Sequence, residues 1–419
     1  MDHIFVASEI HKLEKVIVHR PDAGIARIGP RRAEELLFDD IVYLPDIQKE
    51  HDIFTGILRK SLGDDNVLFI HDLLLEALNA DQAKQEEVIA RIIDFEELPS
   101  KYIQVLAELD NEKLADALIT GYLAEQDLFL FDPIPNFIFT RDIAVTINDH
   151  VVITKAYKVA RFRENFLTRF IFYAHPMFEE LRNSQRIINM NDVELFPPSR
   201  QGEKVSIEGG DIMVLNQDYL LTGCSERTTG YGIQSLKNVL FERGVIKNLV
   251  QVNIPSERSY MHIDTVMTMI REDHVVCYRP LVFDGLSSFV TVYRSNGEQS
   301  AYYSLKDFLL TEINPEMQFI FAGGGVSPYQ EREQWTDGCN LLALKSGVAV
   351  AYDRNPKTQE ALTQAGYTTI SAKDFLDSSL DAEKTENTII TFPSSELSRA
   401  RGGSHCMTLP ILRNSGVRG

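Results

Sequence analysis

Glu208-Gly-Gly-Asp-Ile-Met-Val-Leu-Asn-Gln-Asp-Tyr-Leu-Leu-Thr222 holds two short apolar runs on either side of a polar turn. Two such runs joined by turn residues predict a β-hairpin. A helix is predicted next, from about residue 231 to 243, with Gly244 placed to end it. Residues 248–254 then read as a further strand. The local unit is therefore strand, turn, strand, helix, strand.

The same unit recurs along the chain. Three further hairpins are predicted to begin near Asp142, Thr265 and Asn340. A fifth unit is divided between the ends of the chain, because the apolar run 406–412 has no partner after it and the run 15–19 has none before it. Units that are too small to bury their own apolar face predict radial repetition. If the two ends pair, five α/β units close into a ring.

One stretch departs from this pattern. From residue 72 to 126 the apolar spacing predicts helices only, and Pro99 separates two of them. We interpret this stretch as a small helical bundle inserted in the first unit, with a role in packing or assembly. The predicted catalytic domain then consists of residues 1–71 and 127–419.

Composition limits the classes of partner. The net charge of −19 argues against nucleic acids and anionic membranes, which both require a basic surface. No apolar run approaches the roughly 20 residues that a membrane span needs, and the first residues do not resemble a secretory signal. The four cysteines are scattered and form no Cys-x-x-Cys motif. We therefore expect a cytoplasmic protein, and we expect Cys224, Cys277 and Cys339 to be small core residues.

Polar residues gather at one position of each unit, just before its first strand. Equivalent positions of a ring of repeats converge at one end of its axis, so these side chains are predicted to share one site. Taken singly, each fits a blander interpretation, such as a surface ion pair, a turn or a core histidine. The five segments are Thr140-Arg141-Asp142, Glu208-Gly-Gly-Asp211, His262-Ile-Asp264, Asp337-Gly338 and His405-Cys406.

A thiol, a histidine and several carboxylates suit chemistry on a planar, cationic carbon. Carboxylates accept paired N–H bonds from a guanidinium in its plane. A guanidinium beside Cys406 would favour the thiolate, and His262 would move protons to the departing nitrogen and from the incoming water. The glycines of Arg401-Gly-Gly-Ser-His-Cys406-Met407 are expected to leave the thiol accessible.

Several motifs, in order, resemble the arginine deiminase family of guanidino-modifying (pentein) enzymes, and the resemblance runs from about Leu13 to Leu412. The motifs are Leu36-Leu-Phe-Asp39-Asp40-Ile41, Pro135-Asn136-Phe-Ile-Phe139-Thr140-Arg141-Asp142, Glu208-Gly-Gly-Asp211, Ser225-Glu226-Arg227-Thr228-Thr229, His262-Ile-Asp264-Thr265-Val266, Glu333-Gln334-Trp335-Thr-Asp337-Gly338, Tyr352-Asp-Arg-Asn355 and Arg401-Gly-Gly-Ser-His-Cys406-Met.

The resemblance implies a five-bladed α/β propeller that converts L-arginine and water to L-citrulline and ammonia, without a metal or an organic cofactor. It implies that Cys406 is the nucleophile and forms a covalent thiouronium, that His262 is the general acid and base, and that Glu208 orients His262. Asp142 and Asp264 would bind the guanidinium. The positions that would hold the amino-acid end or gate the site are Asn136, Arg161, Arg227 and Arg401. A homodimer or homotetramer is also implied.

Two features depart from the family pattern. Many members carry a proline and a basic residue before the cysteine, where this chain has Ser404-His405, and the helical insertion is short. Three alternatives stay open from the sequence. One is another guanidino-modifying enzyme that acts on agmatine, a methylated arginine or an amidino donor. The others are a metal hydrolase built on His262, Asp264, Glu208 and Asp211, and a propeller without catalytic activity.

Overall fold

The computed structural model describes residues 4–33, 35–38, 40–286 and 288–414. Asp39 of the motif at residues 36–41, and residues 1–3 at the N-terminus, lie outside this part of the chain. Among the described residues, the strands form five sheets of at least three strands and one two-stranded ribbon. No helix in this part of the chain is both long enough and apolar enough to cross a membrane.

Each of the five larger sheets contains the same motif, an antiparallel strand pair whose second strand is followed by a connection and a parallel third strand. The parallel strand requires a crossover, and in four sheets this crossover contains a helix of nine or more residues. In four sheets the antiparallel pair is a hairpin. These sheets, with the parallel strand given last, are β5 (Ala144–Ile147), β6 (His150–Ile153) and β7 (Ile187–Asn189); β8 (Ile212–Asn216), β9 (Tyr219–Cys224) and β10 (Asn248–Asn253); β11 (Met267–Arg271), β12 (His274–Cys277) and β15 (Gln318–Phe321); and β16 (Leu342–Lys345), β17 (Val348–Tyr352) and β19 (Thr388–Phe392). In the fifth sheet β20 (Leu409–Asn414) pairs with β1 (Lys12–Val18), and β2 (Val67–Phe69) is the parallel strand.

The crossover helices are α7 (Phe162–Ala174), α9 (Gly230–Glu242), α13 (Pro356–Gln364) and α1 (Leu44–Leu62). The helix predicted at about residues 231–243 is α9, and its observed bounds differ by one residue at each end. Between β17 and β19 the chain adds strand β18 (Thr368–Ser371) and helix α14 (Ala372–Asp377), which the repeat pattern did not predict.

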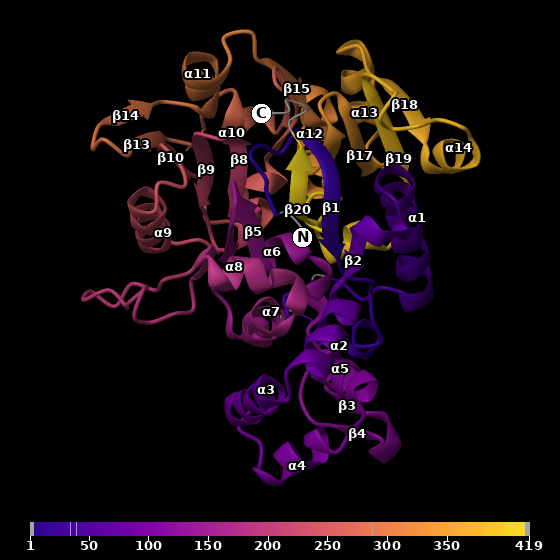
Figure 1. Ribbon diagram of the computed structural model, residues 1–419. Helices are drawn as coiled ribbons and strands as arrows, with labels where there is room; N and C mark the ends of the chain where they lie inside the picture. Colours follow the sequence, from indigo (N-terminus) through magenta and orange to yellow (C-terminus); the bar gives the residue numbers. More distant parts are fainter. Residues whose placement is uncertain (1–3, 34, 39, 287, 415–419) are drawn as a thin grey trace.

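The two ends of the chain meet in one sheet. Strand β1 pairs with β20 in antiparallel register, with Lys12 opposite Asn414 and Ile17 opposite Leu409. The two strands lie side by side in the middle of the molecule (Figure 1). Buried Arg413 on β20 also donates to the carbonyls of His11 and Ala343 at 2.7 and 2.8 Å. The prediction that the terminal runs pair is confirmed, although β20 begins at Leu409 and Cys406 lies in the turn before it.

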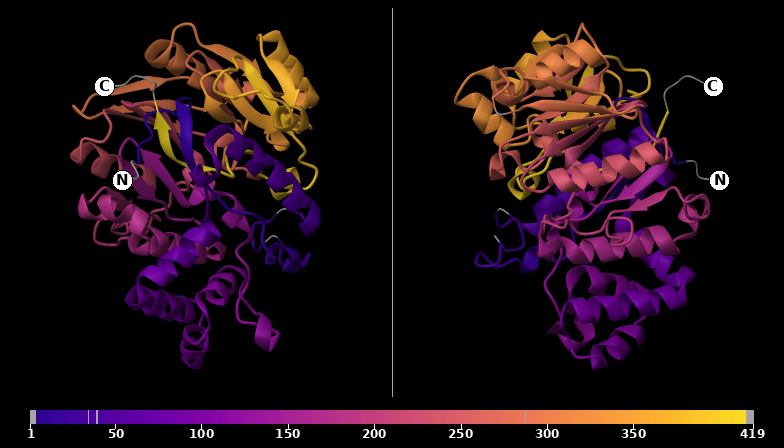
Figure 2. Two further views of the ribbon diagram at one scale, coloured as in Figure 1. Left: turned by 45° about the vertical axis from the view of Figure 1, so that its right-hand side comes forward. Right: turned by 90° about the vertical axis from the view of Figure 1, so that its left-hand side faces the viewer.

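The helices of the stretch 72–126 gather at one end of the molecule, away from the larger sheets, as the views in Figures 1 and 2 agree. They are α2 (Ile70–Ala80), α3 (Gln82–Phe95), α4 (Lys101–Ala107) and α5 (Asn111–Thr120), followed by the ribbon β3 (Tyr122–Leu123) and β4 (Leu128–Phe129). Their buried side chains, Val88 and Ile92 among them, join one apolar cluster with Leu167 and Phe170 of α7. Pro99 lies in the break between α3 and α4.

Candidate active site

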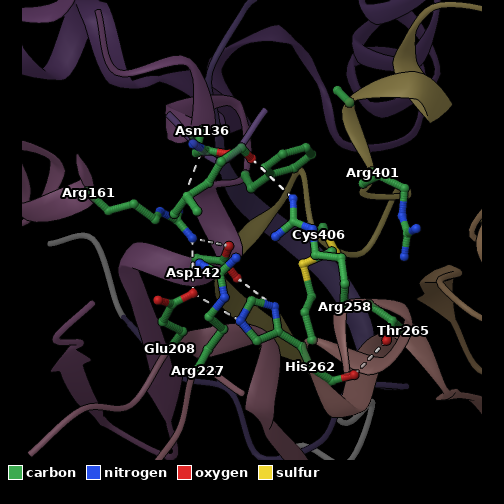
Figure 3. Close-up of a pocket in the computed structure, with 14 residues that line it drawn as sticks. Asn136, Asp142, Arg161, Glu208, Arg227, Arg258, His262, Thr265, Arg401 and Cys406 are labelled. Carbon is green, nitrogen blue, oxygen red and sulfur yellow. Dashed lines mark hydrogen bonds and ion pairs between the residues drawn. The ribbon is translucent and has the colours of Figure 1, made fainter. Parts of the chain in front are cut away.

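Short helical turns just before the first strands carry the polar residues that the sequence singled out. Asp142 lies in α6 (Thr140–Ile143), Glu208 precedes the turn η7 (Gly209–Asp211), and His262 precedes η9 (Ile263–Thr265), which contains Asp264. The side chains of Asp142, Glu208 and His262 point toward one another from these separate turns (Figure 3). Each is at most 6% exposed, so this is a buried group of charges.

His262 lies between two carboxylates. Its Nε2 is 3.0 Å from Glu208 Oε2, and its Nδ1 is 3.6 Å from Asp142 Oδ1. Burial alone would lower the pKa of His262, but Asp142 and the hydrogen bond to Glu208 outweigh burial and raise it to about 10. Burial likewise disfavours the charged form of Glu208, but Arg161 and His262 hold the pKa of this carboxyl well below its usual range. At neutral pH the site therefore holds an imidazolium, which can donate a proton.

Cys406 is 4% exposed and is held by two polar neighbours. Its Sγ donates to Asp264 Oδ2 at 3.3 Å and accepts from Asn340 Nδ2 at 3.1 Å. Burial, followed by the charges of Asp264 and Asp142, raises the pKa of the thiol well above its usual range. In this unliganded state Cys406 is therefore a neutral thiol. A cation that lay against the carboxylates would offset the charges of Asp264 and Asp142, which are the second cause of this shift, and so favour the thiolate.

The two glycines before Cys406 are required by packing. A Cβ atom on Gly402 would lie 2.3 Å from the Phe139 ring, and one on Gly403 would lie 2.6 Å from Asn340 Oδ1. The glycines were expected to leave the thiol accessible, but Cys406 is buried in this structure. The glycines instead allow Phe139 and Asn340 to pack closely against residues 402–406.

Arg161 occupies the group of carboxylates. Its Nη1 donates to Asp142 Oδ2 at 2.7 Å and to Glu208 Oε2 at 3.1 Å, while Nε and Nη2 donate to Glu164 at 2.9 and 2.8 Å. The resemblance implied that Arg161 holds the amino-acid end of a substrate or gates the site. In this structure its guanidinium instead neutralises the acids, which is where a substrate guanidinium would be expected.

A small cavity adjoins these residues. Its volume is about 20 Å³, which is room for roughly one water molecule. Asp264 does not line it, but the other predicted site residues do: Asn136, Asp142, Arg161, Glu208, Arg227, His262, Arg401 and Cys406. Arg401 lies on the far side from Asp142, with its guanidinium carbon 3.4 Å from the centre of the Trp335 ring (Figure 3).

A second cavity, of about 500 Å³, lies next to the first and shares Leu37, Arg227 and Arg258 with it. Arg258 Nη2 donates to the Leu37 carbonyl at 3.4 Å, and both residues line both cavities. An amino acid is far larger than the inner cavity. A substrate must therefore open this contact or displace side chains such as Arg161.

Several site residues had not been predicted. Asn340 bonds Cys406 through its side chain, Glu164 binds Arg161, Arg258 borders the cavity, and Glu9 lies behind Asp264, next to the predicted His405. Asn340 had a detectable signal, because it stands just before a first strand, as the predicted residues do. Glu9 had none, since its partner His405 is 396 residues away along the chain.

The acids and His262 also have the spacing of a metal site. One ligand atom each from Asp142, Glu208 and His262 lies within 4.8 Å of the others. In this structure Arg161 already provides a positive charge at two of these three residues, so a divalent cation would have to displace it. Asp211 and Asp264, which the sequence had considered as further ligands, are not part of this group.

Comparisons with known proteins agree on the fold. The N-terminal domain of ArgZ, an arginine dihydrolase solved with product, matches 96% of this chain and 99% of its own at a TM-score of 0.52 and 12% identity. The amidinotransferase SxtG of Microseira wollei matches 99% of each chain at a TM-score of 0.54 and 13% identity. A DDAH of Pseudomonas aeruginosa in complex with citrulline gives a TM-score of 0.51 at 12% identity, with 95% and 99% of the two chains covered. The chain therefore has the α/β pentein fold.

Sequence comparisons are more specific. The family model described as arginine deiminase matches residues 34–121 and 96–413. Arginine deiminases of Listeria monocytogenes serovar 1/2a (strain EGD-e) and Listeria welshimeri are 34% and 33% identical, over 98% of this chain and 98% of their own. This chain belongs to the arginine deiminase family.

Proposed function

We propose that this amidine hydrolase acts on L-arginine and releases L-citrulline and ammonia. The observation that carries the proposal is the convergence of Cys406, His262 and the carboxylates of Asp142 and Glu208 on one buried cavity, with Asp264 bonded to the thiol behind it. The proposal needs no metal or cofactor, because the chain itself supplies a nucleophile, a proton donor and acceptors for a guanidinium.

In the first step, arginine's guanidinium displaces Arg161 from Asp142 and also bonds Asp264. Oδ1 of Asp264 is buried without a hydrogen-bond partner among the described residues, so it is a vacant acceptor for an N–H group. The new positive charge lowers the pKa of Cys406, and the thiol proton leaves to solvent. Displaced Arg161 keeps its contact with Glu164 and becomes available to the substrate carboxylate.

The chemical steps then follow from the charges. The Cys406 thiolate attacks the central carbon, and the His262 imidazolium protonates one terminal nitrogen, which leaves as ammonia. The product is a thiouronium bound to Cys406. Water attacks this carbon and gives one proton to His262, and the C–S bond breaks. The new hydroxyl loses its remaining proton to solvent, and citrulline leaves with the thiolate restored. Glu208 holds His262 in place in both protonation states.

Arginine is favoured over agmatine by the basic residues around the cavity. Four arginine side chains line it, and guanidiniums suit a substrate that carries a carboxylate, which agmatine lacks; the four are Arg161, Arg227, Arg258 and Arg401. Arg227 is 2% exposed, and its Nε has no hydrogen-bond partner among the residues described. A carboxylate at the end of the substrate would satisfy this donor.

We also propose the larger organisation that the repeat suggests. The five sheets would be the blades of a propeller formed by residues 1–71 and 127–419, and residues 72–126 would be a separate inserted domain. The chain would assemble as a homodimer or homotetramer and would not bind nucleic acid. All four cysteines are unpaired, which supports a reducing, cytoplasmic environment.

One assay separates hydrolysis of L-arginine from hydrolysis of agmatine and from the activity of a metal hydrolase. Purified protein is given L-arginine or agmatine, with and without EDTA, and citrulline (or carbamoylputrescine from agmatine) and ammonia are measured. We expect turnover of arginine that EDTA does not change and little turnover of agmatine. Cys406→Ala should lose turnover by more than a thousandfold, whereas the control Cys277→Ala, which removes another buried thiol, should retain it. Activity that EDTA abolishes and a divalent ion restores would instead favour a metal hydrolase at Asp142, Glu208 and His262.

A further inference from the structure

We propose that Ser225 is a specificity-determining residue, which holds Arg227 in place for the carboxylate of the substrate and is itself anchored by Asp211. This inference rests on the proposed function, because it concerns the preference for arginine over agmatine. Neither Ser225 nor Asp211 lines the inner cavity, so both act through other residues.

Asp211 is fully buried at the end of the turn η7. Its Oδ1 accepts from the backbone N–H of Ile263 at 2.8 Å, and Ile263 directly follows His262. Its Oδ2 accepts from the Ser225 hydroxyl at 2.5 Å. One side chain therefore joins the turn that follows His262 to the segment 225–228.

Gly223, in strand β9, makes room for this carboxylate. A Cβ atom at Gly223 would lie 2.3 Å from Asp211 Oδ1 and 3.0 Å from Ile263 Cβ. Glycine weakens a strand, so its presence there indicates that another segment approaches closely. The packing at Gly223 thus supports the contact of Asp211 with Ile263 independently of the hydrogen bonds.

Ser225 fixes the backbone that carries Arg227. Its Oγ accepts from the N–H groups of Arg227 and Thr228 at 3.0 and 3.2 Å, as serine does in many turns. These two bonds occupy both acceptor sites of the hydroxyl, so its hydrogen is directed to Asp211. The contact with Asp211 therefore sets how the Ser225 oxygen faces the two amides.

Arg227 relies on this turn for its position. Its side chain is 3% exposed and borders the inner cavity together with His262 (Figure 3). Among the described residues, its Nε has no hydrogen-bond partner, and its one ion pair joins Nε to Glu226 Oε1 at 3.6 Å. Arg161, by contrast, donates four hydrogen bonds of at most 3.1 Å to three carboxylates. The direction of the Arg227 guanidinium is therefore decided mainly by its backbone.

Loss of the Ser225 hydroxyl should weaken binding and spare the chemistry. Two amides lose their acceptor, and Arg227 moves away from the place where a substrate carboxylate would lie. Asp211 keeps its bond to Ile263, so His262 stays between its two acids. Agmatine has no carboxylate, so its hydrolysis should not change.

The test is steady-state kinetics of Ser225→Ala with L-arginine and with agmatine at about pH 8, which lies above the pKa of Asp211 and keeps this acid a carboxylate. Burial raises the pKa of Asp211 to about 7. We expect KM for arginine to rise about tenfold and kcat to stay within about threefold of the wild type, because the lost contact is the same before and during the reaction. For agmatine, kcat/KM should stay within about threefold, or its inhibition constant against arginine where turnover is too slow to measure.

Asp211→Asn tests the anchor. The amide oxygen can still accept from Ile263, but the amide nitrogen cannot accept from the Ser225 hydroxyl. We expect KM for arginine to rise about tenfold here too, and no further in the double variant with Ser225→Ala, because both changes break one contact. Effects on KM that multiply would overturn the anchoring by Asp211. If Asp211→Asn does not fold, the Ser225 variants decide the inference.

Two further variants serve as controls. Ser225→Thr keeps the hydroxyl and should restore the wild-type KM. Ser288→Ala removes another buried hydroxyl, which donates to the Leu281 carbonyl, and should change neither kcat nor KM. A folded Ser225→Ala enzyme that melts at a lower temperature but keeps the wild-type KM and preference would show that Ser225 is merely structural, and the inference would be wrong. A wild type that does not hydrolyse arginine would overturn the proposed function, and this inference with it.

Discussion

Asn340 contacts the loop that carries Cys406, the proposed nucleophile, through both ends of its amide. Its Oδ1 accepts from the backbone N–H groups of His405 and Cys406, each at 3.1 Å, and its Nδ2 donates to the Cys406 sulfur. All of these groups are buried. Asn340 therefore sets the position of the thiol and satisfies two amides that water cannot reach.

Replacing Asn340 tests this arrangement. Asn340→Ala leaves two buried N–H groups without an acceptor, so we expect unfolding in urea to show a loss of about 1–3 kcal/mol. The displaced sulfur should also reduce kcat at least tenfold. Steady-state kinetics and urea titration measure the two effects separately. A variant with wild-type kcat would show that the loop holds Cys406 without this amide.

The charge of His262 should stabilise the folded protein over a defined pH range. Its pKa is raised from 6.5 to about 10, so the contribution is complete below pH 6.5 and is lost as pH rises toward 10. The wild-type melting temperature should therefore fall between pH 7 and 10. In His262→Gln this fall should be smaller, which thermal melts at matched ionic strength would show. Parallel curves for the two proteins would contradict the assignment.

At the residue scale, the sequence identifies the side chains that line the cavity but not the buried residues that hold these side chains in place. Asp142, Glu208 and His262 can be found because each occupies the same place in a repeat. The contacts of Glu9 with Arg141 and His405 join parts of the chain that no local pattern connects. The position of Arg161 was also beyond prediction, because it depends on which acids need a counter-charge in the absence of substrate.

At the scale of elements, the backbone of the turn η7 passes close to His262 and Asp142. A Cβ atom on Gly210 would lie 2.5 Å from His262 Nδ1 and 3.0 Å from Asp142 Oδ1. Only a glycine leaves this space to the imidazole and the carboxylate. Its backbone N–H also donates to Asp142 Oδ1 at 3.2 Å, so the turn both admits and holds the acid.

Gly210→Ala should therefore damage catalysis more than folding. The methyl group displaces His262 from its place between the acids, and we expect kcat to fall at least a hundredfold. Gly56→Ala in helix α1 is the control, since its methyl group would meet only ordinary contacts at 3.7 Å. Circular dichroism checks the fold of both variants. Near-normal turnover by Gly210→Ala would mean that His262 need not stay in this position.

Elements were predictable where pairing is local. The hairpins β5–β6, β8–β9 and β16–β17 join neighbouring apolar runs by short turns, and the sequence shows both the runs and the turn residues between them. The hairpin β13 (Val290–Arg294) and β14 (Gln299–Tyr302) was missed, because β13 extends the sheet of an earlier repeat by pairing with β10. A repeat pattern assigns each strand to its own unit, so it cannot show that β13 joins the sheet of another unit.

At the scale of the whole molecule, the sheet of β2, β1 and β20 closes the chain upon itself. The pairing of β1 with β20 was predictable because each run lacked a partner nearby. The five α/β units and their order followed from the same pattern. The packing of α3 against α7 did not, because the amphipathic faces of the insertion do not specify which helix they cover.

Because the first and last strands are neighbours, the order of the units should matter more than the position of the ends. A permuted chain with the original termini joined by a short Gly/Ser linker, and with new termini in the exposed turn 295–298, should fold and retain kcat within about threefold. Activity and melting temperature provide the measurements. A permutant that folds but is inactive would show that the open ends themselves contribute to the site.

The same strand pairing has a consequence for synthesis. A ribosome makes β1 long before β20, and Cys406, the proposed nucleophile, lies just before β20. The strand β1 must therefore wait for its partner until β20 has been translated. A nascent chain that stops before residue 406 lacks both the closing strand and the proposed nucleophile, so we expect it to be catalytically silent.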